Sequence, residues 1–178
     1  MNAGVVATRY AKAIYEFALE KGEESVVYES LGLLAGNFSR LPELSSALKD
    51  PTISAQQKSE VLLTACGNTK SETLRKVIHL VLKNDRVDYM ENIALVYGEQ
   101  YRKSKGIVIA HLTSVEPAGE KMKKELVDII SKITQDQVEF HTQTDPDIIG
   151  GFILEIENNR LDASVRDQLN RLRLDLIN

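Results

Sequence analysis

The stretch Arg9–Lys21, RYAKAIYEFALEK, decides how the first half of the chain folds. Arg9, Lys12, Glu16 and Glu20 fall within an arc of roughly 80° on a helical wheel of about 100° per residue. Nearly everything else from Val6 to Leu19 is apolar, so the apolar arc spans roughly 240°, whereas a surface helix needs a stripe only slightly wider than ~100°. The stretch therefore predicts a helix with more apolar surface than one core requires.

The same helical period continues to about Lys103, and its interruptions are short. The opening helix is expected to end near Gly22, because glycine accepts the left-handed backbone of a helix end. Ser54 is a plausible N-cap for the fourth helix. Six helices joined by loops of a few residues predict an antiparallel all-α bundle. The five further segments are 25–38, a short one between Pro42 and Pro51, 54–66, 71–84 and 86–105.

The helix expected at 71–84 has the same surplus of apolar surface as the opening helix. Its apolar residues cover roughly 200° of the wheel; they are Leu74, Val77, Ile78, Leu80, Val81 and Leu82. Two explanations are open. The two helices are central in the bundle and buried on several sides, or they border a groove that receives an amphipathic helix of another protein. Periodicity alone favours the central helices.

After Gly106 the pattern changes to short strands. GIVIAHLTSVE (106–116) is rich in β-branched residues and predicts a strand, followed by a helix over 117–134. Strands are expected at 137–145 and within 148–162, with a hairpin turn at Asn158-Asn159. A last helix closes the chain with four apolar residues inward, namely Val165, Leu169, Leu172 and Leu176. The β-α-β-β-α order predicts a small α+β unit.

The expected fold class is therefore α+β and mainly α. A six-helix bundle is expected over residues 1–105 and a small α+β domain over residues 106–178.

Composition excludes several classes of protein. The 178-residue chain has 22 basic and 26 acidic residues, which argues against a nucleic-acid partner, because phosphate contacts need a concentrated basic surface. Its single cysteine, Cys66, cannot form an internal disulfide and is expected to be packed in the interior. No apolar run reaches the ~20 residues of a membrane-spanning helix. The polar face of the opening helix carries two acids and two bases, whereas helices that lie on a membrane favour Lys and Arg there, so direct membrane insertion is not expected.

No catalytic or metal-binding constellation is recognisable in the sequence. His79, His111 and His141 are expected to lie far apart, and none has the i, i+4 partner of a metal site. Gly150-Gly151 lacks the other residues of a phosphate loop and is typical of a bulge or a close backbone approach. Three carboxylates near the last hairpin are scattered by strand alternation: Glu155, Glu157 and Asp162. We expect no metal, no cofactor and no enzymatic activity; an enzyme with a hidden site in the C-terminal part is a minor alternative.

Three segments carry a resemblance to a known family. They are RYAKAIYEFALEKG (9–22), VLLTACG (61–67) and DPDIIGGFILEIENNRLDASVRDQLNRL (145–172). In this order they resemble the delta subunit of F-type ATP synthases, whose mitochondrial counterpart is the oligomycin sensitivity-conferring protein. The resemblance extends over essentially the whole chain.

The resemblance implies a non-catalytic stator subunit of a proton- or sodium-translocating ATP synthase. The N-terminal domain would bind N-terminal helices of alpha subunits in the catalytic head, and the C-terminal domain would bind the b subunits of the peripheral stalk. The head would then not rotate with the central shaft. The protein would be a monomer within the complex and a peripheral subunit. The absence of an organelle-targeting extension before Met1 favours the cytoplasmic face of a bacterial inner membrane.

The resemblance also implies site residues. The alpha-subunit helix would lie between the first and fifth helices, against Tyr10, Ala13, Leu80 and Asn84; the wheel adds Val6, Phe17 and Val77. The opposite side of the first helix would then face the core, with Ala7, Ala11, Ile14 and Ala18. The stalk-side motif comprises Gly150, Gly151, Asp162, Ser164 and Arg166. The alternative function is a generic helical peptide-binding scaffold module unrelated to ATP synthesis.

Overall fold

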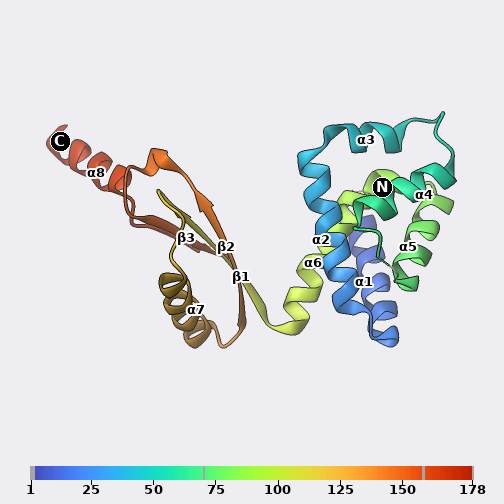
Figure 1. Ribbon diagram of the computed structural model, residues 1–178, viewed down its shortest axis with the longest axis horizontal. Helices are drawn as coiled ribbons and strands as arrows, with labels where there is room; N and C mark the ends of the chain where they lie inside the picture. Colours follow the sequence, from blue (N-terminus) through green and yellow to red (C-terminus); the bar gives the residue numbers. More distant parts are fainter. Residues whose placement is uncertain (1–2, 70, 158, 178) are drawn as a thin grey trace. The chain divides into compact units, whose positions relative to one another are not determined.

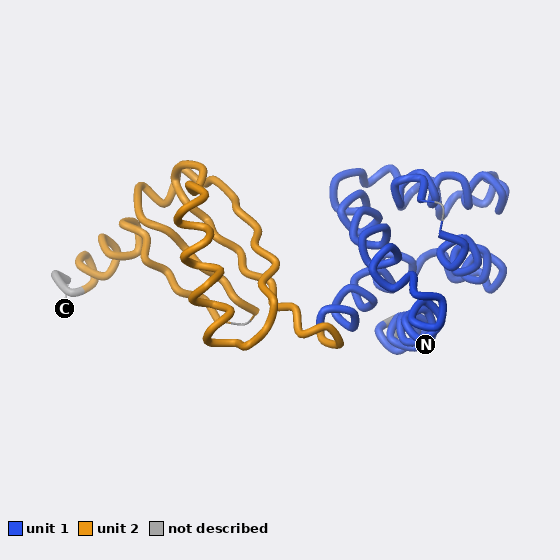
Figure 2. The backbone as a smooth tube through the Cα atoms, turned by 60° about the horizontal axis from the view of Figure 1, so that its bottom comes forward, with its two compact units in different colours: residues 1–102 blue, residues 103–178 orange. Residues whose placement is uncertain are grey.

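The computed structural model describes residues 3–69, 71–157 and 159–177 (Figure 1). The chain divides into two compact units, residues 1–102 and 103–178 (Figure 2). The first unit is helical and the second contains the only sheet of the described residues. The expected α+β class, with helices first and a small sheet after them, is confirmed.

The first unit consists of a series of helices with short connections. They are α1 (Ala3–Lys21), α2 (Glu24–Arg40), α3 (Pro42–Lys49), α4 (Ala55–Ala65), α5 (Glu72–Lys83), the 3-10 turn η1 (Val87–Tyr89) and α6 (Met90–Lys105). Gly22 follows α1 with φ +66°, the conformation expected of a helix-ending glycine. Ser54 caps α4 as predicted: its hydroxyl accepts from the Gln57 amide, and the Gln57 side chain accepts from the Ser54 amide.

Hydrogen bonds link the start of α5 to the connection between α1 and α2. The Glu23 carboxylate accepts hydrogen bonds from the Ser71 hydroxyl (2.7 Å) and from the Thr73 amide (3.2 Å). The Ser71 hydroxyl in turn accepts from the Leu74 amide. Hydrogen bonds from Ser71 and then Thr73 lower the pKa of Glu23. This junction fixes where α5 begins relative to the end of α1.

The core of the first unit lies on the alanine side of α1. The side chains of Ala7, Ala11, Ile14 and Ala18 are buried, as the family resemblance implied. The small alanines allow neighbouring helices to approach closely, and α2, α5 and α6 complete the core with larger apolar residues. Among these are Leu31, Leu34, Leu74, Ile78, Met90, Ile93 and Tyr97, all fully buried.

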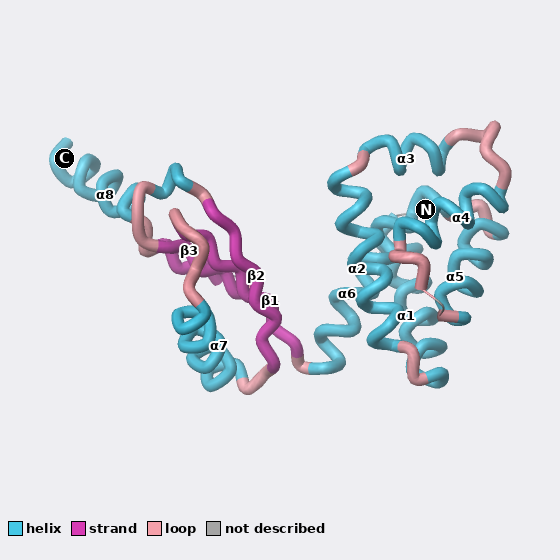
Figure 3. The backbone as a smooth tube through the Cα atoms, in the orientation of Figure 1, coloured by secondary structure: helices cyan, strands magenta, loops and turns pink. Residues whose placement is uncertain are grey.

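The second unit is a four-stranded sheet in the order β2-β1-β3-β4 (Figure 3). Its elements are β1 (Ile107–Ser114), α7 (Glu120–Thr134), β2 (Gln137–Thr144), η2 (Pro146–Ile148), β3 (Phe152–Ile156), β4 (Asn159–Asp162) and α8 (Val165–Ile177). Strand β1 pairs in parallel with β2 and antiparallel with β3. Ile130 of α7 packs with Ala110, Leu112 and Leu154, so α7 covers one face of the sheet.

Two details of the second unit differ from the sequence prediction. The segment 148–162 contains two strands, because the short β4 pairs with β3. Asn159 pairs with Ile156 and so belongs to β4, and the turn begins at Glu157 (φ 50°), one residue earlier than expected. Asn158 lies outside the described residues.

The orientation predicted for α8 was wrong. Leu169 and Leu172 are 52% and 58% exposed and do not face a core. The helix makes its main contact with η2, near its first turn, where Val165 donates from its amide to the Gly150 carbonyl. Without a sheet face beneath them, the later leucines remain in solvent. The side chain of Leu176 lies outside the described part of the chain.

Candidate helix-binding groove

A groove lies between α1 and α5 in the first unit. It encloses a volume of about 360 Å³ and is lined by Val5, Val6, Arg9, Tyr10, Ala13, Leu80 and Arg86. The two helices run antiparallel, since Tyr10 meets Asn84 at one level and Phe17 meets Lys76 at another. The groove therefore follows the first half of α1 and the last turn of α5.

The walls of the groove are held together by one side-chain hydrogen bond. The Asn84 amide donates to the Tyr10 hydroxyl at 2.9 Å. Leu80 is 49% exposed and Ala13 is also exposed, so apolar atoms of both helices remain in contact with solvent. A small residue at position 13 leaves room above α1, while Tyr10 is half-buried beside it. The arrangement leaves an apolar surface exposed between the two helices, next to the hydrogen bond that joins them.

Most of the predicted groove residues gather here. Val6, Tyr10, Ala13 and Leu80 line the groove, and Asn84 joins it through Tyr10. Val77 does not: it is 4% exposed and packs in the core beneath α5. Phe17 lies farther along α1, with the ammonium groups of Lys21 and Lys76 6.0 and 5.9 Å from its ring.

Three lining residues were not predicted from the sequence: Val5, Arg9 and Arg86. Arg9 lies three residues after Val6 and four before Ala13, and Val5 lies four residues before Arg9, so helical spacing was an available signal. Arg9 was assigned to the polar arc of the wheel. Arg86 follows the end of α5, where helical periodicity gives no information on side-chain direction.

A second apolar groove of about 680 Å³ lies on another side of the same unit, between α2 and α4. Its apolar lining includes Leu41, Leu44, Ile53, Val61 and Ala65. Helical periodicity does not predict this groove, since α4 lacks a surplus of apolar residues comparable to that of α1.

In the second unit, the predicted stalk-side glycines form the joint between η2, β3 and α8. Gly151 has φ +74°, and a Cβ atom there would overlap the carbonyl oxygen of Ala163. Only glycine fits both conditions without strain. The amides of Val165 and Ala163 donate to the carbonyls of Gly150 (3.0 Å) and Phe152 (2.9 Å). The paired glycines thus mark the close backbone approach that the sequence indicated.

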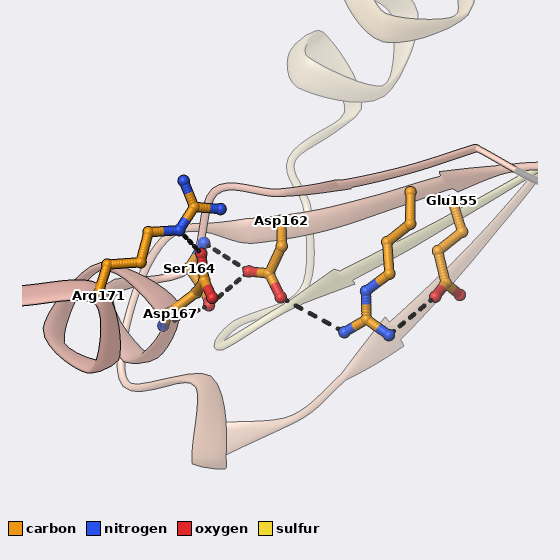
Figure 4. Close-up of polar contacts among 6 residues, drawn as sticks. Glu155, Asp162, Ser164, Asp167 and Arg171 are labelled. Carbon is orange, nitrogen blue, oxygen red and sulfur yellow. Dashed lines mark hydrogen bonds and ion pairs between the residues drawn. The ribbon is translucent and has the colours of Figure 1, made fainter. Parts of the chain in front are cut away.

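Asp162 and Ser164 extend this joint into α8 (Figure 4). The Asp162 carboxylate accepts from the Ser164 hydroxyl (2.6 Å) and amide (3.0 Å), and the Ser164 hydroxyl accepts from the Asp167 amide (3.1 Å). Hydrogen bonds from Ser164 are the main cause of a lowered pKa for Asp162. Arg160 lies 3.4 Å from both Asp162 and Glu155. These contacts fix the start of α8; Arg166 is half-buried in its first turn.

The expectation that the histidines lie far apart was wrong for two of them. His111 and His141 occupy opposite positions of β1 and β2, and their rings stack with centroids 5.2 Å apart. Parallel pairing across the intervening helix α7 brings them together, which spacing alone does not reveal. The described residues contain no group of three or more side chains able to hold a metal ion. Nor does any described helix have the length and apolarity to cross a membrane.

Comparisons with known proteins show which family the chain resembles. The family model for the ATP synthase delta (OSCP) subunit matches residues 6–176. The ATP synthase subunit delta of Azobacteroides pseudotrichonymphae is 45% identical over 177 residues, covering 99% of this chain and 100% of the relative. That of Phocaeicola vulgatus is 40% identical over 178 residues, with 99% and 96% covered. A chain of the Toxoplasma gondii mitochondrial ATP synthase hexamer has the same fold, with a TM-score of 0.69, 20% identity and 97% of each chain covered.

The groove indicates a type of recognition surface, and the comparisons show the family. A helical unit with a preformed apolar groove between two helices has the geometry of helix-in-groove recognition, in which side chains bind and no bond is made or broken. The chain belongs to the family of ATP synthase delta (OSCP) subunits, the non-catalytic stator subunits of ATP synthase.

Proposed function

We propose that the groove between α1 and α5 binds the N-terminal helix of an alpha subunit of the catalytic head. Residues 106–178 bind the b subunits of the peripheral stalk. The chain then links head and stalk as a monomer and prevents the head from rotating with the central shaft. It does so as a peripheral subunit at the cytoplasmic face of a bacterial inner membrane.

The observation that carries the head-side proposal is the exposed apolar lining of the groove. Leu80, Val5 and Ala13 face solvent in the isolated chain, and burying apolar surface contributes about 25 cal/mol/Å². An ordinary stable interface buries roughly 800 Å² on each partner. A helix resting on these residues also explains why α1 is apolar on two sides: its alanine side packs in the core and its Tyr10 side receives the partner.

A charge placed in the groove tests this proposal. In Ala13→Asp, docking would bury a carboxylate against apolar atoms, which costs several kcal/mol unless the carboxylate is paired. We expect the variant to keep its helical circular dichroism and to bind a synthetic alpha-subunit N-terminal peptide at least tenfold more weakly. Gln56→Asp, on the exposed first turn of α4, is the matched control with the same added charge. Unaltered affinity of Ala13→Asp would rule out the groove assignment.

The same titration distinguishes the proposed function from the alternative, a generic peptide-binding scaffold. A generic peptide-binding scaffold would bind unrelated amphipathic helices of equal length and charge as well as it binds the alpha peptide. A stator subunit binds the alpha peptide preferentially.

For the stalk side, exposed leucines of α8 support a docking surface. Leu169 and Leu172 are three residues apart, so they lie on one face of the helix, and both are more than half exposed. The predicted motif of Gly150, Gly151, Asp162, Ser164 and Arg166 acts in this proposal by setting the start of α8. Leu172→Asp should weaken binding to the C-terminal segment of a b subunit, whereas Asn170→Asp, exposed on another face, should not. Equal binding by the two variants would show that this face of α8 does not contact the b subunit.

A further inference from the structure

Two arginines border the groove between α1 and α5. Arg9 is exposed on α1, and Arg86 is half-buried just after α5; both belong to its lining. The Arg86 guanidinium lies 5.7 Å from the centre of the Tyr89 ring, a contact that limits its freedom. Apart from the Tyr10 hydroxyl, the remaining side chains of the lining are apolar.

Neither guanidinium has a carboxylate partner among the residues that the structure describes. Lys12 of α1 pairs with Glu16 at 3.9 Å and Lys76 of α5 pairs with Glu72 at 2.7 Å, and neither of these paired lysines lines the groove. The chain carries more acidic than basic residues, 26 against 22. The groove between α1 and α5 therefore carries local positive charge, although the net charge of the whole chain is negative.

We propose that Arg9 and Arg86 are specificity-determining residues that pair with one or more carboxylates beside the apolar face of the docked helix. This inference rests on the proposed function, in which the groove receives the alpha-subunit helix. A guanidinium presents a planar fork of donors that matches a carboxylate, so the pairing restricts orientation as well as adding attraction. Charged groups at the rim of an interface also accelerate association and disfavour wrong partners.

The position of the arginines fixes the register of the occupant. Arg9 precedes Ala13 by four residues, about 6 Å along α1, and Arg86 lies at the same end of the groove because α5 runs antiparallel to α1. The carboxylate of the docked helix therefore lies roughly one turn from the side chain that contacts Ala13. A helix shifted by one turn would bury its apolar residues equally well and leave the carboxylate unpaired.

The test measures how salt and charge change the affinity for the alpha-subunit N-terminal peptide. The full chain, the double variant Arg9→Gln/Arg86→Gln and the control Arg40→Gln/Arg75→Gln are titrated at about 0.1 M and 1 M salt, where the Debye length falls from ~10 Å to ~3 Å. The control removes the same charge from exposed positions outside the groove. We expect about tenfold weaker binding for the groove variant at low salt, less than twofold for the control, and a smaller difference at high salt.

The peptide offers the reciprocal change. A peptide whose Asp and Glu residues are replaced by Asn and Gln should bind the wild-type chain about tenfold more weakly than the native peptide does. The double variant should bind the two peptides with equal affinity, because it has already lost the arginine–carboxylate pairing. Arg9→Gln alone, which leaves Arg86 over Tyr89, repeats the test if the double variant loses helicity. Equal affinity and equal salt dependence of wild type and groove variant would overturn this inference and leave the proposed function standing. Absence of binding by the wild type would overturn both.

Discussion

Truncating Leu80 measures how much the exposed wall of the groove contributes to binding. Fully burying a leucine contributes about 1.5–3 kcal/mol. Leu80 is 49% exposed in the free chain, so docking would bury about half of its surface and contribute about 1 kcal/mol. Because 1.4 kcal/mol is a factor of ten in Kd, Leu80→Ala should weaken peptide binding about fivefold.

Leu95 on α6 provides a matched control. It is 50% exposed and lies outside the groove, so Leu95→Ala should change the affinity less than twofold. Both leucines are about half buried in the free chain, so the two changes should lower the thermal midpoint by a similar small amount, and comparing their affinities cancels this effect. The assay is calorimetric titration of the full-length variants with the alpha-subunit N-terminal peptide. An unchanged affinity for Leu80→Ala, or equal losses for the two variants, would show that Leu80 does not contact the docked helix.

Two further predictions concern stability. Gly151→Ala should destabilise the second unit by about 2 kcal/mol or more, because alanine is strained at φ +74° and its Cβ would overlap the Ala163 carbonyl. The control Gly119→Ala has open space around it but replaces the N-cap of α7, so it should cost no more than about 1 kcal/mol, and amide exchange of the sheet should distinguish the two. Glu23→Gln should destabilise the helical unit at pH 7. Since the folded pKa of Glu23 lies below its ordinary 4.5, the carboxylate stabilises the fold above that value and loses this effect as pH falls through the folded pKa. The difference between wild type and variant should therefore shrink in acid; a pH-independent difference would contradict the assigned hydrogen bonds.

The sequence predicts the helices well because each has a clear period and end signal. Ser54 and Gly22 act as expected, and the alanine side of α1 is buried. The wheel also revealed surplus apolar surface on α1 and α5, but it did not distinguish a core from a groove. On α5 both are present: Val77 is in the core while Leu80 is half exposed.

The remaining features depend on contacts between segments that periodicity does not encode. The pairing of His111 with His141 follows from the parallel register of β1 and β2. Leu169 and Leu172 have a helical spacing that indicates a buried stripe, yet the fold places no surface beneath them. Arg86 reaches the groove from a connection after α5, and its role follows only from the packing of α5 against α1.

Docking of an alpha-subunit helix between α1 and α5 can be observed by methyl NMR of the full chain, recorded with and without the alpha-subunit N-terminal peptide. We expect large shifts for the methyl groups of Val5, Val6 and Leu80, and unchanged signals for Leu41 and Val61 in the groove between α2 and α4. Shifts confined to Leu41 and Val61, or no shifts at a saturating peptide concentration, would contradict it.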